Sequence, residues 1–77
     1  MKCTAKLIWA DGAWYSKVYT SDGDNVRLTL ESGSFDALVE RVKIALPEML
    51  ELNFGYTGDV QLSFEAERND NLIAVAS

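Results

Sequence analysis

Histidine and cysteine, two side chains that enzymes often use, are nearly absent from this sequence. It contains no histidine, the residue that most often serves as a general base or a metal ligand. The single cysteine, Cys3, therefore has no imidazole to activate it as a nucleophile. Cys3 also falls on the apolar side of an alternating segment, so we expect it to be a small core residue.

The 12 acidic residues are scattered, and their spacing forms no recognisable site. Asp22 and Asp24 resemble the start of a calcium loop, but the later ligands and the closing glutamate are missing, so we predict a turn. The segments GSFDAL and GYTG lack the spacing and the lysine of a phosphate-binding loop. We therefore expect no catalytic residue, no metal and no cofactor, and an enzyme is the function that the sequence favours least.

The size and charge of the chain restrict its partners. Its 77 residues are enough for one domain, expected to span residues 1–77. The formal net charge of −5 disfavours nucleic acid and anionic membrane, and it favours a basic partner. One cysteine allows no internal disulfide, Lys6 and Asp11 interrupt any signal-peptide core, and no apolar run approaches the roughly 18 residues of a membrane span. We expect a soluble cytoplasmic protein.

Four segments alternate apolar and polar residues with the period of two that is typical of half-buried strands. They are residues 3–10, 14–20, 26–31 and 60–67. Short turns at 11–13 and 21–25 separate the first three, which predicts an antiparallel meander. The side chains expected to face the core are Cys3, Ala5, Leu7, Trp9, Trp14, Ser16, Val18, Val26, Leu28, Leu30, Val60, Leu62, Phe64 and Ala66.

Residues 34–53, SFDALVERVKIALPEMLELN, have apolar side chains every three or four positions, which predicts an amphipathic helix. Ser34 is the expected N-cap, and Asp36 lies in the first turn, where a carboxylate favours the helix dipole. Pro47 lies on the polar side, where water can satisfy the Lys43 carbonyl that it leaves unpaired. We expect one helix bent at Pro47, and the alternative is a break at which Pro47 starts a second helix.

These elements predict an α+β fold of order β-β-β-α-β. The helix is expected to end at Asn53 or Gly55 and to cover one face of the sheet in a two-layer sandwich. A right-handed crossover makes the fourth strand parallel to the first, which gives the sheet order 3-2-1-4. Residues 72–76, LIAVA, are apolar on both sides, so they form either a fifth strand hairpinned to the fourth or a segment that pairs only with another chain.

Two stretches carry a resemblance to a known family. The helix of residues 34–53, with its Pro-Glu pair and Leu-Glu-Leu-Asn ending, and the Trp14–Tyr15 pair resemble short stand-alone HicB-like bacterial proteins of unknown function, which are related to the N-terminal domain of HicB antitoxins. The resemblance implies a single HicB-like domain with a partial ribonuclease-H-like sheet. The loop SDGDNVR departs from the family, because it lacks the usual Pro-Gly pair.

The family resemblance also implies a partner. HicB antitoxins neutralise HicA, a small basic toxin that cleaves messenger RNA with a histidine, and an acidic chain suits such a partner. Full antitoxins carry a C-terminal DNA-binding domain, and this chain shows none before its last residue, Ser77, so operator binding is not expected. A ribonuclease-H site needs a carboxylate on the first strand, where this sequence has none, so nuclease activity is not expected either.

Two surfaces could bind a partner. The first is the outer side of the helix, where acidic residues flank one isoleucine, although a charged outer side is usually just solvated. Its residues are Asp36, Glu40, Ile44, Glu48 and Glu51. The second is the uncovered sheet face, where Ile8, Tyr15, Lys17 and Tyr19 lie among Lys2, Lys6 and Arg27.

The uncovered sheet face has three interpretations. Aromatic residues interleaved with basic ones resemble a platform for single-stranded nucleic acid. Ordinary cross-strand pairing of Lys6 or Lys17 with Glu65 or Glu31 explains the same pattern without a ligand. A contact between copies of the chain, which gives a homo-oligomer, is the functional use that we favour for this face.

The leading hypothesis is a non-catalytic protein-interaction domain. In its most specific form it is an orphan or stand-alone HicB-like antitoxin that sequesters a small basic mRNA-cleaving toxin. The alternative is a self-associating structural or small-ligand-binding module with no toxin partner. The third hypothesis is a weak binder of single-stranded nucleic acid that uses the open sheet face.

Overall fold

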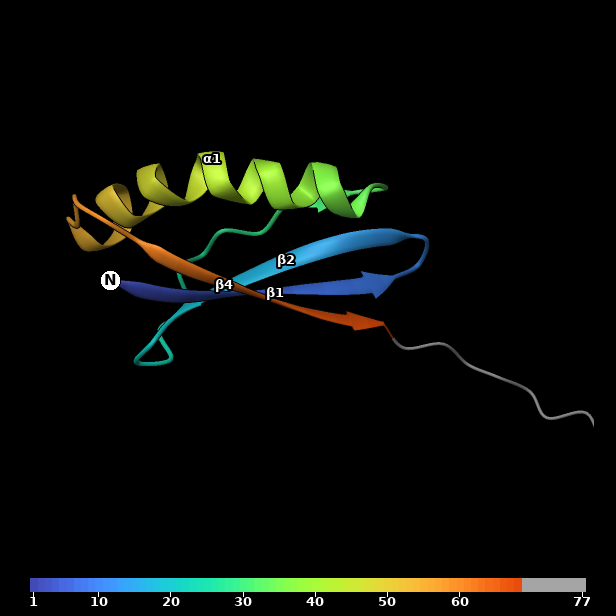
Figure 1. Ribbon diagram of the computed structural model, residues 1–77, viewed down its shortest axis with the longest axis horizontal. Helices are drawn as coiled ribbons and strands as arrows, with labels where there is room; N and C mark the ends of the chain where they lie inside the picture. Colours follow the sequence, from blue (N-terminus) through green and yellow to red (C-terminus); the bar gives the residue numbers. More distant parts are fainter. Residues whose placement is uncertain (69–77) are drawn as a thin grey trace, which may run out of the picture.

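The computed structural model describes residues 1–68, which form one helix packed on one face of a four-stranded mixed sheet (Figure 1). The sheet order is β3-β2-β1-β4, and β4 runs parallel to β1, so the predicted α+β architecture and strand order are confirmed. Residues 72–76, whose pairing the sequence left open, lie outside the described residues. The elements are β1 (Lys2–Ala10), β2 (Ala13–Thr20), β3 (Glu31–Ser32), α1 (Phe35–Phe54) and β4 (Gln61–Arg68).

A tight hairpin joins β1 and β2. The two strands pair antiparallel from Cys3 opposite Thr20 to Ala10 opposite Ala13. The two turn residues, Asp11 and Gly12, have φ values of 51° and 80°. Positive φ at both positions is the geometry of a type I′ turn, whose twist matches that of the strands it connects.

The helix α1 runs without a break through Pro47, so the prediction of one helix is confirmed and the alternative of a second helix is wrong. The Ser34 hydroxyl accepts a hydrogen bond from the Ala37 amide at 3.3 Å, as expected of an N-cap. Gly55, with φ of 64°, ends the helix in the left-handed conformation, which Asn53 does not adopt. The side-chain amide of Asn53 instead donates a hydrogen bond to the Val26 carbonyl at 2.7 Å. This bond connects the end of the helix to the segment before β3.

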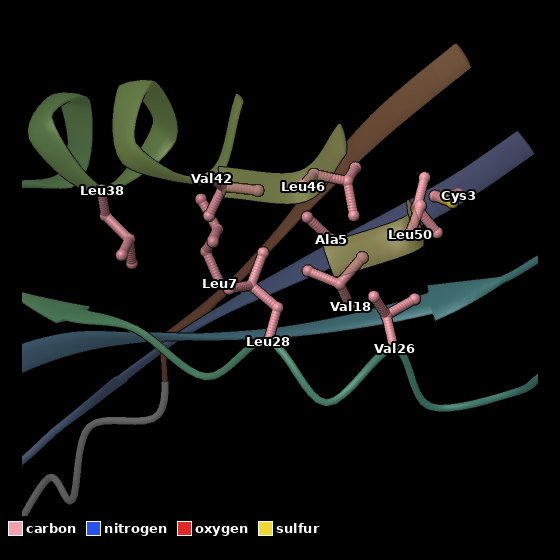
Figure 2. Close-up of a cluster of buried hydrophobic side chains, with 10 residues drawn as sticks. All are labelled: Cys3, Ala5, Leu7, Val18, Val26, Leu28, Leu38, Val42, Leu46 and Leu50. Carbon is pink, nitrogen blue, oxygen red and sulfur yellow. The ribbon is translucent and has the colours of Figure 1, made fainter. Parts of the chain in front are cut away.

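The hydrophobic core lies between α1 and the sheet (Figure 2). Four helix residues spaced four apart, Leu38, Val42, Leu46 and Leu50, supply one side of it. The sheet and the segment before β3 supply the rest: Cys3, Ala5, Leu7, Val18, Val26 and Leu28. Burying one such aliphatic side chain stabilises a fold by about 1.5–3 kcal/mol, so this stripe holds α1 on the sheet.

The third strand is much shorter than predicted. We expected residues 26–31, but only Glu31–Ser32 form β3. Tyr15 of β2 pairs with Glu31, and Tyr19 of β2 pairs with Asn25. The two tyrosines are four residues apart in the sequence, whereas their two partners are six residues apart. The two extra residues bulge out around Arg27, whose φ of 63° does not allow an extended strand.

The core still receives the side chains that this segment was expected to supply. Val26 and Leu28 are buried, and Leu30 packs against the core. The buried Ser16 hydroxyl accepts a hydrogen bond from the Leu30 amide at 3.0 Å, and the Ser16 amide donates to the Leu30 carbonyl at 2.9 Å. These two bonds hold the irregular segment against β2.

The inner face of β4 is only partly covered. Val60, Leu62 and Phe64 are half-buried, and Ala66, which we expected to face the core, is exposed. The reason is the position of α1, which approaches β2 and β3 more closely than β4. The helix therefore leaves apolar side chains accessible along the β4 side of the sandwich.

Candidate functional site

A groove runs between α1 and the start of β4. Its larger part is a hollow of about 370 Å³ beside Pro47, and a second hollow of about 160 Å³ shares Pro47 and Val60 with it. We call the two together the Pro47 groove. Its lining residues are Lys43, Ile44, Leu46, Pro47, Glu48, Leu50, Glu51, Tyr56, Thr57, Gly58, Val60 and Leu62.

The loop after α1 forms the far wall of the Pro47 groove. The Tyr56 hydroxyl donates to the Asp59 carbonyl at 2.6 Å and fixes the tyrosine ring across the loop. Gly58 has a φ of 142°, and a Cβ there would lie 3.2 Å from the Tyr56 hydroxyl oxygen. Glycine is therefore needed at this position, both for its backbone conformation and for the close approach of Tyr56.

The larger hollow of the Pro47 groove is acidic. Its charged lining residues are Glu48 and Glu51, while Lys43 lines the smaller hollow. The N-terminal ammonium of Met1 donates to the Tyr56 hydroxyl and to the Asp59 carbonyl behind the far wall. The last turn of α1 carries no basic side chain, although the carbonyl end of a helix dipole favours cations. Glu51 therefore adds to the negative potential of the helix end, which attracts a cationic group.

Exposed apolar side chains lie on the same half of the helix. Ile44 is 77% exposed, and Leu52 is 71% exposed. Ile44, Glu48 and Leu52 are four residues apart, so they follow one line along the helix surface. An acidic residue between two exposed aliphatic residues is a surface that both a cation and an apolar side chain can contact.

The structure divides the predicted partner surface into two groups. Ile44, Glu48 and Glu51 line the Pro47 groove together. Asp36 and Glu40 are also exposed on α1, but they lie nearer its start and do not line the groove. Glu40 forms an exposed ion pair with Lys43 at 3.3 Å, a contact that contributes about 0–1 kcal/mol to stability.

Sequence reasoning missed several residues of this site. Helical periodicity predicts Pro47 on the outer side of the helix but does not predict a groove there, and it does not single out the exposed Leu52 beside the groove. The signal for Leu52 is its position, one residue away from the apolar stripe of the helix. The sequence around Tyr56 and Val60 contains no such signal, because these residues reach Pro47 only where the chain turns back after α1.

The second predicted surface, the open sheet face, is formed by β1, β2 and β4. Ile8 pairs with Tyr15, Thr4 with Tyr19, and Lys6 with Lys17. The Lys6 ammonium lies 5.8 Å from the centre of the Tyr19 ring, within reach of a cation–π contact. The negative charge of Glu31, with a smaller contribution from partial burial, raises the pKa of Tyr15, so its hydroxyl remains a hydrogen-bond donor.

The structure differs from two expectations for the open sheet face. Arg27 was expected there, but it lines a hollow of about 620 Å³ with Asn53 and Phe54 at the end of α1, because the bulge before β3 redirects it. Lys6 lies opposite Glu65 in the register, yet no ion pair joins the two among residues 1–68. The carboxylates of β4 on this face also weaken the case for phosphate binding.

Within residues 1–68, no group of three or more histidine, cysteine or acidic side chains is placed to hold a metal ion. Burial raises the pKa of the Cys3 thiol, which disfavours the reactive thiolate. No helix among residues 1–68 has the length and apolar content to cross a membrane.

Comparisons with known proteins give one match. A protein-family model described as a domain of unknown function (DUF1902) matches residues 5–75. No curated protein and no solved structure matches the chain. The match covers the whole helix and all the residues of the Pro47 groove, and its description contains no link to HicB.

Proposed function

The chain belongs to the DUF1902 family, and we propose that it is a non-catalytic protein-interaction domain that binds a small basic protein in the Pro47 groove. The observation that carries this proposal is an apolar groove with two glutamates at one edge of its larger hollow, whose lining contains no lysine or arginine. Pro47, Tyr56 and Val60 give the groove apolar walls, and Glu48 and Glu51 lie beside them.

The chemistry of the groove describes its partner. Interfaces draw most of their binding free energy from a few large side chains that fill a desolvated pocket. A hollow of about 370 Å³ accommodates such a side chain, for which Ile44 and Val60 supply apolar contacts. Lysine or arginine around it would face Glu48 and Glu51, and complementary charge mainly accelerates association and excludes other partners. The partner we propose presents an apolar residue within a basic segment.

In its more specific form, the proposal is that the chain is a stand-alone HicB-like antitoxin that sequesters a small basic mRNA-cleaving toxin. The resemblance to the HicB-like proteins is carried mainly by residues 34–53, which include Ile44, Pro47, Glu48 and Glu51 of the groove. The stretch that resembles the family thus supplies the helix side of the groove. A self-associating module without a toxin partner is the second candidate, because α1 covers only one face of the sheet (Figure 1).

Co-expression with a small basic protein encoded beside this chain tests the proposal. We expect the unmodified chain to relieve the toxicity of that neighbour. Glu48→Lys combined with Glu51→Lys is expected to weaken binding of the purified neighbour by about tenfold or more, because both carboxylates then repel a basic surface. Isothermal titration calorimetry measures this affinity, and growth of the co-expressing cells measures relief.

A control variant with the same change in net charge distinguishes the local effect of the groove carboxylates from the effect of the net charge of the chain. Asp22→Lys combined with Asp36→Lys alters exposed acids away from the groove, and its affinity is expected to stay within about threefold of the original. If both double variants weaken the affinity for the neighbour equally, the groove is not the binding site. A neighbour that is harmless, or that kills with the chain present, would exclude the antitoxin role.

A further inference from the structure

The open sheet face carries opposite charges on its two sides. Across the sheet, three rows of side chains run from β2 through β1 to β4. The middle row is Lys17, Lys6 and Glu65, so its positive end lies on β2 and its negative end on β4. The neighbouring rows are Tyr19, Thr4 and Ser63, and Tyr15, Ile8 and Glu67.

The charged ends of the middle row have no partner within the described chain. The side chains of Lys17 and Glu65 take part in no hydrogen bond or ion pair among residues 1–68. Lys6 stands directly opposite Lys17, an arrangement of like charges that destabilises a pair of strands. The Lys6 ammonium lies over the Tyr19 ring, which belongs to the neighbouring row. Lys17 is therefore the lysine of the middle row that is placed to contact a partner.

We propose that a second copy of the chain packs on this open sheet face about a twofold axis that runs parallel to the strands over β1. Such an axis exchanges the β2 side of one copy with the β4 side of the other. Lys17 of each copy then faces Glu65 of the other, and the two contacts are equivalent by symmetry. Thr4, Lys6 and Ile8 lie on the axis, where each meets itself. The two Lys6 ammonium groups lean away from each other, because each lies over the Tyr19 ring on the β2 side of its own copy.

A twofold axis across the strands would be unfavourable, because it would place Lys17 against Lys17 of the second copy. The layout of charges therefore selects one of the two simple ways to stack the faces. Half-buried Ile8, Tyr15 and Tyr19 give the centre of the contact apolar and aromatic surface. The opposite side of the sheet, with α1 and the Pro47 groove, stays accessible in such a dimer (Figure 1).

The size of the face sets the expected strength of the dimer. Three strands of eight residues span about 26 Å by about 14 Å, from the usual rise per residue and strand spacing. This footprint is smaller than the roughly 800 Å² that each partner contributes to a standard interface. We therefore expect a reversible dimer with a dissociation constant in the micromolar range that weakens as salt screens the Lys17–Glu65 contacts.

Charge reversal on either side of the axis tests this arrangement. Lys17→Glu places two pairs of like charges across the axis, and so does Glu65→Lys, so each variant alone is expected to dimerise at least about tenfold more weakly. Mixing the two variants restores opposite charge at both contacts. We expect analytical ultracentrifugation over a wide concentration range to find weak self-association of each variant and a mixed dimer near the original strength.

Lys43→Glu on the outer side of α1 is the control, because it makes the same change in net charge as Lys17→Glu, and it should dimerise like the original chain. Thermal unfolding of every variant checks that the fold is kept. A monomer at all concentrations would overturn the proposal. Single variants that dimerise as the original does, or a mixture that stays monomeric, would equally overturn it.

Discussion

Cys3 lies in the hydrophobic core, in a position that favours a small apolar side chain over a reactive thiolate. Its side chain is 3% exposed and belongs to the buried cluster beneath α1 (Figure 2). Burial raises the pKa of its thiol, because the thiolate would lose its hydration in this apolar environment. A buried thiol in its neutral form packs like a small apolar side chain and is a poor nucleophile.

We predict that Cys3 reacts with a thiol reagent far more slowly in the folded chain than in concentrated urea. At mildly alkaline pH the unfolded chain exposes thiolate, whereas the folded chain hides a protonated thiol. Stopped-flow absorbance with a chromogenic disulfide measures both rates. Similar rates in the two states would contradict the burial of Cys3.

The same thiol links stability to pH. Above the ordinary pKa of 9.0 the unfolded chain releases the Cys3 proton, while the folded chain retains it because its pKa is raised. The folded state then binds more protons than the unfolded state, so the free energy of unfolding falls as pH rises through this range. The raised pKa of Tyr15 acts in the same direction at higher pH.

At the scale of elements, α1 keeps a proline that a helix interior normally disfavours. Pro47 cannot donate a backbone hydrogen bond to Lys43, and a proline inside a helix costs about 3 kcal/mol relative to alanine. Pro47 is exposed, so water can reach the Lys43 carbonyl. The C-terminal turns of α1 dip toward the sheet in Figure 1, as expected for a helix bent at its outer side.

We predict that Pro47→Ala increases the free energy of unfolding by about 1–3 kcal/mol, measured by urea denaturation. The alanine restores the hydrogen bond to Lys43, although part of the gain is offset by greater freedom of the unfolded chain. The same change removes a wall of the Pro47 groove and should weaken binding of the basic partner. A stabilised variant that binds the partner as before would mean that Pro47 has no role in binding.

The elements also show what the sequence could and could not predict. Alternation located β1, β2 and β4, because one side of each strand carries apolar residues at every second position, and it identified Val26 and Leu28 as core residues. It did not predict the bulge around Arg27, since alternation records which side chains are buried but not whether a backbone ladder continues. The exposure of Ala66 depends on where α1 lies across the sheet, which no local pattern contains.

The sequence likewise predicts only some residues of the Pro47 groove. Helical periodicity placed Ile44, Glu48 and Glu51 together on the outer side of α1. The opposite wall of the groove comes from Tyr56 and Val60, which meet the helix only because the chain turns back at Gly55 and Gly58. Local pattern thus predicted one side of the groove, and tertiary folding was needed for the other.

For the whole molecule, the two-layer design presents two different surfaces on opposite sides. Figure 1 shows α1 on one side of the sheet and no helix on the other. The α1 side carries the acidic Pro47 groove, and the other side carries the open sheet face with Lys17 at one end and Glu65 at the other. Because the surfaces do not overlap, a dimer through the sheet leaves both grooves accessible. We therefore expect two copies of the chain to bind two copies of the basic partner.

Photo-crosslinking in the native cell tests the central claim most directly. A photoreactive amino acid in place of Ile44, at the edge of the Pro47 groove, is expected to crosslink the chain to one small basic protein, identified by mass spectrometry. The same amino acid in place of Asp22, in the turn after β2, should give no such product. Equal products from both positions, crosslinks only to acidic proteins, or none at Ile44 would contradict the account.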